Sequence, residues 1–156
     1  MLNVNLGDYN ITQLGYIYKD IKNQAKLLES RLGVPKFAYF ENKFRGTYKY
    51  RGKDTKYWNL IALSKGIGLQ IELIQLIEGD CIFSEFINEG KEGLHHYGIY
   101  VKEIAPIKEQ FLDKGFEIVH EGTTGIVNVL YFDTLDLLGV YLEFQESAKK
   151  RRKKMK

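Results

Sequence analysis

The feature that most constrains the fold is an internal repeat. The segment QLGYIYKDI at 13–21 lines up with HYGIYVKEI at 96–104, and both lead from a β-rich stretch into a helical one. A second match, GLQIEL at 68–73 with GVYLEF at 139–144, follows in the same order. Two ordered matches favour duplication over chance similarity of short strands, so we expect two copies of one supersecondary unit.

The two matches have different offsets, 83 residues for the first and 71 for the second, so the first copy carries an insertion of about a dozen residues. We place this insertion at 44–57, a stretch rich in Lys, Arg, Gly and Tyr, and expect a polar loop at Lys53 and Asp54. The aromatic residues around it are candidates for lining a substrate pocket or for ordinary strand packing. They are Tyr48, Tyr50, Tyr57 and Trp58.

Each copy is expected to form a strand, a helix and three further strands. In the first copy, apolar residues at helical spacing predict a helix near 20–32 that ends at Gly33, with strands near 11–19, 36–42, 57–64 and 68–76. In the second, the helix falls near 104–114, with strands near 95–102, 116–121, 126–132 and 138–146. The connector 77–94 has room for one short helical turn. The pattern predicts an α+β fold of two βαβββ modules, about 11–76 and 95–146, in a single domain spanning 1–148.

The net charge of +3 misrepresents the folded part of the chain. Seven of the 23 basic residues lie in 149–156, which leaves 16 basic against 20 acidic residues in the rest. We expect the basic tail 149–156 to be disordered and solvated. The acidic body argues against nucleic acid as a partner.

Several features indicate a cytoplasmic protein. No apolar run approaches the roughly 20 residues that span a bilayer, so we expect no membrane partner. The first residues lack the basic-then-apolar pattern of a secretion signal. The single cysteine, Cys81, cannot form an internal disulfide, which fits a reducing compartment.

Four polar residues occupy matched positions in the two copies. Gln13 corresponds to His96 at the start of the first strand of each copy, and Glu72 corresponds to Glu143 in the last. Taken singly, each is an ordinary strand residue on a solvent face. Taken together, and brought into one cleft by a pseudo-twofold, they offer one imidazole, one amide oxygen and two carboxylates to a divalent cation. His95 adjoins His96, and only the repeat alignment selects His96 as the one that points inward.

The chain resembles the vicinal oxygen chelate superfamily, which includes glyoxalase I and methylmalonyl-CoA epimerase. The resemblance covers about 11–146. It is carried by QIELIQ at 70–75, by GLHHYGI at 93–99, and by FDT at 132–134 followed by GVYLE at 139–143. It implies paired βαβββ modules forming a curled mixed sheet around a metal-binding cleft. It also implies a homodimer.

The resemblance further implies the ligands and the chemistry. The family's ligand positions fall on Gln13, Glu72, His96 and Glu143, which would hold one divalent ion: Zn, Ni, Co or Mn. A small substrate (a 2-oxo compound, a thiol adduct or an acyl-CoA) would lose a proton next to a metal-polarised carbonyl, through an enolate or enediolate. Glu143 and Glu72 are the catalytic candidates, with Glu143 the preferred base.

The resemblance leaves the reaction open within the superfamily. Gln at the first ligand position resembles some glyoxalase I enzymes, whereas the segment 86–96 resembles the epimerase branch. No glutamate lies between Glu41 and Glu72, which argues against an epimerase with a second acid, and no glutathione-binding signature is present. The alternative from another class is a binding protein of the bleomycin-resistance type without chemistry. A ring-cleaving dioxygenase is a third possibility, weakened by Gln13 where that branch has His.

Overall fold

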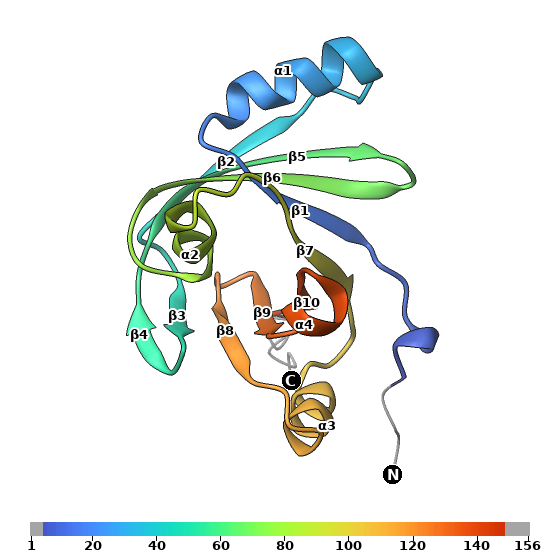
Figure 1. Ribbon diagram of the computed structural model, residues 1–156, viewed down its shortest axis with the longest axis vertical. Helices are drawn as coiled ribbons and strands as arrows, with labels where there is room; N and C mark the ends of the chain where they lie inside the picture. The colour runs from blue at the N-terminus through green and yellow to red at the C-terminus, as the bar shows by residue number, and fades with distance from the viewer. Residues whose placement is uncertain (1–4, 149–156) are drawn as a thin grey trace, which may run out of the picture.

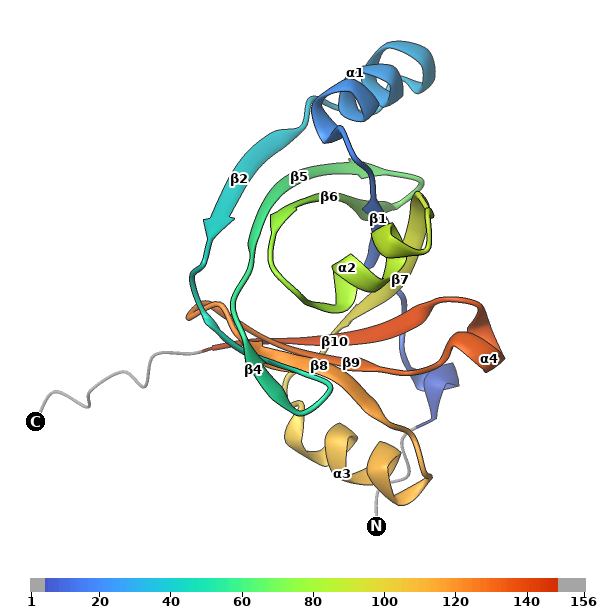
Figure 2. The same ribbon diagram turned by 60° about the vertical axis from the view of Figure 1, so that its left-hand side comes forward.

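Residues 5–148 form one mixed sheet of ten strands that curls around its own inner face, with three α-helices packed against it and a fourth, short helix in the connection between the last two strands (Figures 1 and 2). The structure is a computed structural model and describes residues 5–148. The strands are β1 (Gln13–Ile17), β2 (Ala38–Lys43), β3 (Thr47–Tyr50), β4 (Lys53–Thr55), β5 (Trp58–Gly66), β6 (Leu69–Glu78), β7 (Gly93–Tyr100), β8 (Ile118–Thr123), β9 (Val127–Phe132) and β10 (Tyr141–Ser147). The helices are α1 (Ile21–Leu32), α2 (Ile82–Asn88), α3 (Ala105–Asp113) and α4 (Leu135–Leu138), and a 3₁₀ turn covers Leu6–Asp8.

The strand order confirms the duplication. It runs β2-β5-β6-β1-β7-β10-β9-β8-β3-β4, so the two modules meet at β1 and β7 and extend outward in matching order. Within each module the first strand pairs in parallel with the last, β1 with β6 and β7 with β10, whereas β1 and β7 are antiparallel. The predicted α+β fold with two βαβββ modules is therefore confirmed. The basic tail 149–156 lies outside the described residues.

The register confirms both offsets of the repeat. Gly15 faces Glu72 across β1 and β6, and Gly98 faces Glu143 across β7 and β10. Helix α1 ends at Gly33, whose φ of 67° is the left-handed conformation expected of a helix stop. In the connector 77–94, α2 is longer than the single turn expected.

The insertion differs from the loop that we expected. It forms a hairpin of β3 and β4, and Lys53 and Asp54 are paired strand residues. The hairpin leaves its own module and extends the sheet of the other, because β3 pairs with β8 from Thr47 opposite Thr123 to Tyr50 opposite His120. Local sequence shows only the hairpin residues, whereas the pairing partner lies about 70 residues away along the chain.

Each module divides its apolar residues between an outer and an inner face. On the outer face of the first, α1 buries Ile21 and Ala25 in a cluster with strand residues such as Leu73. On the second, α3 buries Ile107 and Phe111 in the same way. Among residues 5–148, none of the helices combines the length and the apolar run that a bilayer crossing requires.

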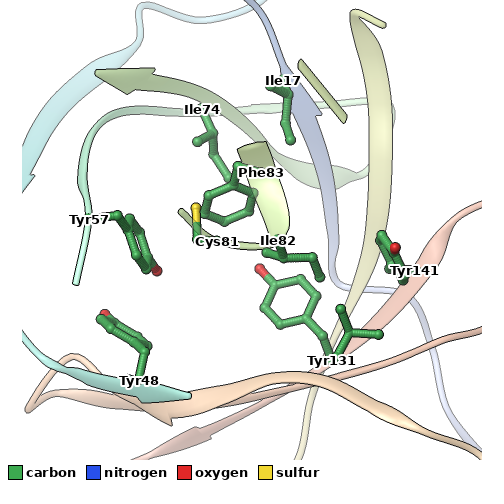
Figure 3. Close-up of a cluster of buried hydrophobic side chains, with 10 residues drawn as sticks. Ile17, Tyr48, Tyr57, Ile74, Cys81, Ile82, Phe83, Tyr131 and Tyr141 are labelled. Atoms are coloured by element: carbon green, nitrogen blue, oxygen red, sulfur yellow. The ribbon is translucent and has the colours of Figure 1, made fainter. Parts of the chain in front are cut away.

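An aromatic cluster occupies the inner face and joins the two modules. Figure 3 shows Tyr48 from β3 facing Tyr57, with Phe83 of α2 and Tyr131 of β9 alongside. The rings of Tyr48 and Tyr57 have centroids 5.0 Å apart. The inserted hairpin thus supplies part of the lining between the modules.

Two glycines make close approach possible where the modules meet. The ring of His96 lies directly over Gly15, because a Cβ added to Gly15 would be 2.0 Å from Cε1 of His96. The side chain of Gln13 packs against the equivalent Gly98 in the same way, since a Cβ added to Gly98 would be 3.0 Å from Oε1 of Gln13. Each module therefore places its first polar residue on the glycine of the other.

Replacing Gly15 with alanine tests this arrangement. The new methyl group has no room beside the His96 ring, so we expect Gly15→Ala to lower the free energy of unfolding by about 1–3 kcal/mol. Urea denaturation measures the change. Gly7→Ala is the matched control, because a Cβ there meets no atom within 4 Å. Equal stability of the two variants would contradict the packing of His96 on Gly15.

Candidate metal centre

The structure brings all four sequence-predicted residues to the central strands of the sheet. Gln13 and His96 lie on β1 and β7, the antiparallel pair at the join, and Glu72 and Glu143 lie on the flanking strands β6 and β10. Glu72 shares its strand face with Gln70 and Ile74, and all three line one cavity. The pseudo-twofold expected from the repeat therefore places the four residues together.

A histidine between two carboxylates forms the centre of the group. Nε2 of His96 lies 3.3 Å from Oε1 of Glu72 and 3.5 Å from Oε1 of Glu143. The His96 side chain is fully buried, that of Glu143 is 3% exposed and that of Glu72 is 14% exposed. Nε2 of His96 makes no hydrogen bond of standard geometry, so it is a buried nitrogen aimed at two negative oxygens.

The electrostatics of the group shift two pKa values in the same direction. Burial alone would lower the pKa of His96, but the charges of Glu143 and Glu72 outweigh it and raise that pKa above its usual value. Burial, together with the charge of Glu72, raises the pKa of Glu143 to about 7, although His96 acts against the rise. The folded group therefore holds protons that the same residues release in water.

Gln13 is held by a chain of amide side chains. Its Nε2 donates to Oε1 of Gln70 at 2.7 Å, and its Oε1 accepts from Nε2 of Gln145 at 3.1 Å. The same Nε2 of Gln145 donates to Oε1 of Glu143 at 2.7 Å. The amide oxygen of Gln13 is thereby fixed beside the Glu143 carboxylate.

Two residues that support Glu143 were not among the sequence-predicted site residues. Gln145 lies two positions after Glu143 on the same face of β10, a signal that was available from strand alternation. Tyr131 lies opposite Glu143 across β9 and β10, and its phenol forms a hydrogen bond with the carboxylate. Finding Tyr131 requires the register of β9 against β10, which the repeat alone does not supply.

The outcome for the histidine pair also differs from expectation. We expected only His96 to point inward, yet both His95 and His96 are buried, at 2% and 0% exposure. The cause is a bulge in β7: Gly15 faces His96 and the next residue, Tyr16, faces Leu94, so His95 is an extra residue. A bulge breaks the alternation that would send neighbouring side chains to opposite faces.

The group opens onto a cavity of about 560 Å³ between the two modules. Gln13, Glu72 and Glu143 contribute to its wall, and most of the remaining lining is apolar or aromatic. Of the aromatic residues around the insertion, Tyr48 and Tyr57 line the cavity. A mostly apolar cavity with a few convergent polar groups is the usual form of a small-molecule site.

One further acid lines this cavity. Glu41 on β2 contributes to the wall from the first module, whereas Glu143 contributes from the second. The absence of glutamate between Glu41 and Glu72 therefore does not deprive the cavity of a second acid, because Glu41 itself supplies one. The inserted hairpin explains why linear spacing misleads here: it adds residues between Glu41 and Glu72 without moving β2 away from the cavity.

The donor chemistry of the group fits a divalent cation. An imidazole nitrogen without a hydrogen bond, two carboxylates and an amide oxygen suit the borderline metals from Mn to Zn. Among residues 5–148, no three His, Cys, Asp or Glu side chains already surround a common point. The carboxylates instead approach His96 directly, as they do when a proton occupies the place of a cation.

These pKa shifts predict how stability depends on pH. A group with a raised folded pKa stabilises the fold at low pH, and that contribution is lost as pH rises through the folded value. The side chains of His95 and His120 act in the opposite sense, because burial lowers their pKa values and their contribution to stability grows as pH rises. The informative quantity is therefore the free energy of unfolding of the metal-free wild type minus that of Glu143→Gln. We expect this difference to fall by on the order of 2 kcal/mol between about pH 5 and pH 8, whereas Glu109→Gln, at an exposed position on α3, should follow the wild type. A difference that grows over this range would contradict the assignment.

The sequence matches one family model over most of its length. The family model described as Glyoxalase/Bleomycin resistance protein/Dioxygenase superfamily matches residues 12–129. No curated protein matches the chain.

Solved structures with the same fold include two epimerases. The methylmalonyl-CoA epimerase of Mycobacterium tuberculosis is 17% identical, with a TM-score of 0.69 over 96% of this chain and 94% of that one. A variant of the Streptomyces coelicolor enzyme in complex with 2-nitronate-propionyl-CoA is 16% identical, with a TM-score of 0.66 over 90% and 95%. A hypothetical protein from Bacillus halodurans is 21% identical, with a TM-score of 0.64 over 90% and 96%. At these identities the likeness establishes the fold, and because the family model spans well over half of the sequence, the chain belongs to the glyoxalase/bleomycin resistance protein/dioxygenase superfamily.

Proposed function

We propose that this chain is a divalent-metal-dependent lyase or isomerase that moves a proton on the carbon next to a carbonyl group. The observation that carries the proposal is the buried His96 between Glu72 and Glu143, at matched positions of the two modules and beside a cavity large enough for a small substrate. A purely structural role does not explain why two carboxylates and an imidazole are gathered where burial disfavours their charge.

In this proposal Gln13, Glu72, His96 and Glu143 hold the cation (Zn, Ni, Co or Mn). When bound, it supplies Lewis acidity toward the substrate carbonyl and lowers the pKa of the neighbouring C–H group. The chain's own contribution is to hold these four side chains from four adjacent strands and to exclude water with the apolar cavity wall.

Glu143 is the proposed base. Its carboxylate lines the cavity and lies beside His96, so it is placed to take a proton from a substrate bound next to the cation. Hydrogen bonds from Gln145 and Tyr131 hold its carboxylate in place. The carboxylate takes the carbon-bound proton and leaves an enolate or enediolate. In a lyase Glu143 itself returns the proton to a neighbouring atom, whereas in an isomerase a second acid delivers a proton to the opposite face.

Glu41 favours an isomerase over a lyase. Inversion at carbon needs one group to remove the proton and another to deliver it on the opposite face, and Glu41 and Glu143 enter the cavity from different modules. The fold likeness to two methylmalonyl-CoA epimerases points the same way. We therefore propose a small acyl thioester or 2-oxo compound as the substrate. On the family resemblance we also propose a homodimer located in the cytoplasm.

Solvent isotope exchange tests the two acids separately. The protein is loaded with Co²⁺ or Zn²⁺ and incubated in D₂O with methylmalonyl-CoA, and in parallel with the hemithioacetal of methylglyoxal and glutathione. We expect Glu143→Gln to slow exchange by about 10²–10⁴-fold. Glu41→Gln should stop inversion while one-sided exchange through Glu143 continues, and Glu109→Gln should change neither.

Other outcomes would overturn parts of the proposal. Turnover of the hemithioacetal that is insensitive to Glu41→Gln would indicate the lyase instead. A wild-type protein that binds no stoichiometric divalent metal and exchanges no proton, yet binds small apolar ligands in the cavity, would indicate the non-catalytic binding protein.

A further inference from the structure

The contact between His95 and His96 carries an inference about how the centre is oriented. Their Nδ1 atoms lie 2.9 Å apart, which is a hydrogen-bond distance between two ring nitrogens. Consecutive strand residues ordinarily point to opposite faces, but the bulge at His95 brings the two rings together. The irregular pairing of β1 and β7 therefore places a second imidazole, that of His95, behind the ring of His96.

The direction of this hydrogen bond follows from the position of His96. Its Nε2 faces the two carboxylates, so a His96 that offers Nε2 to a cation must carry its single proton on Nδ1. Nδ1–H of His96 then donates, and Nδ1 of His95 must accept. An accepting Nδ1 carries a lone pair, so the single proton of His95 is then on its Nε2.

The surroundings of His95 hold its ring in place. The rings of Phe83, Phe86 and Tyr141 have centroids 5.5, 5.3 and 5.2 Å from that of His95. At its far edge, Nε2 of His95 is buried without a hydrogen bond of standard geometry, and the backbone of Ile82 is the polar group beside the ring. Phenylalanine would pack in such a box without burying that nitrogen, so packing alone does not explain a histidine here.

We propose that His95 is a positioning residue that accepts the Nδ1 proton of His96 and thereby fixes the tautomer and the ring orientation in which Nε2 faces the cation. This inference rests on the proposed function. Groups that hydrogen-bond the free nitrogen of a metal-binding histidine commonly raise metal affinity by 10–100-fold. Here the supporting group is a neutral imidazole rather than the usual carboxylate or carbonyl.

Nitrogen NMR tests the hydrogen bond without any metal. The chain has three histidines, so ¹⁵N-histidine labelling produces only three ring systems. We expect a coupling across the hydrogen bond between the two Nδ1 atoms, with the proton attached to His96. A proton attached to Nδ1 of His95, or no coupling between the rings, would overturn the proposal, and neither result depends on catalysis or on a variant that must fold.

Zinc affinity tests the consequence. The protein is titrated with Zn²⁺ alone in competition with a chromophoric chelator, and thermal unfolding reports whether each variant is folded. His95→Phe keeps the aromatic packing but removes the acceptor, so we expect Zn²⁺ to bind about 10–100-fold more weakly. His95→Asn offers Oδ1 near the position of Nδ1 and should restore most of the affinity.

His120→Phe is the matched control. His120 is buried in the same aromatic cluster, but its ring contacts the Tyr57 hydroxyl at 3.5 Å rather than His96. Its loss should leave Zn²⁺ affinity unchanged. Equal weakening by His95→Phe and His120→Phe would mean that the cluster acts only through packing and would overturn the positioning role. If the wild-type protein bound no Zn²⁺, the proposed function would fail, while the NMR result would still decide the hydrogen bond.

Discussion

The close approach of β1 and β7 is the constraint on which the rest of the structure depends. Two strands that both carry large side chains toward one another could not bring an imidazole and an amide to the join. Gly15 and Gly98 have no side chain in the way. The side chain of His96, from the second module, fills the space over Gly15, and that of Gln13, from the first module, fills the space over Gly98. The same two glycines face Glu72 and Glu143 across the parallel strand pairs. One small residue per module thus clears the place for four polar side chains.

The cavity follows from how the remaining apolar surface is divided. Helices α1 and α3 cover the outer faces and bury the residues that alternate outward. The inner faces of the two modules are turned toward a common space by the curl of the sheet (Figure 2). The β3–β4 hairpin, which crosses from one module to the edge of the other, adds Tyr48 to that lining. The polar group therefore lies at the join of the modules, with apolar walls rising from it.

Burial at this join decides the chemistry available to the polar group. Burial raises the pKa of Glu143, and the charge of Glu72 adds to that rise. The charges of the two carboxylates raise the pKa of His96 against the effect of burial, so both groups hold protons more tightly. A divalent cation satisfies the same attraction more fully than a proton. The tendency to bind a cation and the capacity to accept a proton near neutral pH thus have a single physical origin.

The repeat was sufficient to predict the architecture and the four polar residues, because equivalent positions in duplicated modules must be related by symmetry. It was insufficient wherever one copy departs from the other. The hairpin exists only in the first module, so its pairing with β8 was not predictable from local sequence. The position of Glu41 in the cavity wall likewise became visible only in the structure. The bulge at His95 shifts the register between β1 and β7. It breaks the alternation of side chains from which we had assigned His95 and His96 to opposite faces. Gln145, by contrast, was within reach of simple strand alternation from Glu143.

The most direct measurement is an anomalous-scattering map from crystals grown with Co²⁺ or Mn²⁺. A cation held as proposed gives a single strong peak in the cavity, within about 2.0–2.3 Å of Nε2 of His96 and of oxygen atoms from Glu72, Glu143 and Gln13. The carboxylates should move apart from the imidazole relative to the arrangement described above. A cavity without a peak in a protein saturated with either metal, with His96 still in contact with both carboxylates, would contradict the assignment of these residues as a metal centre.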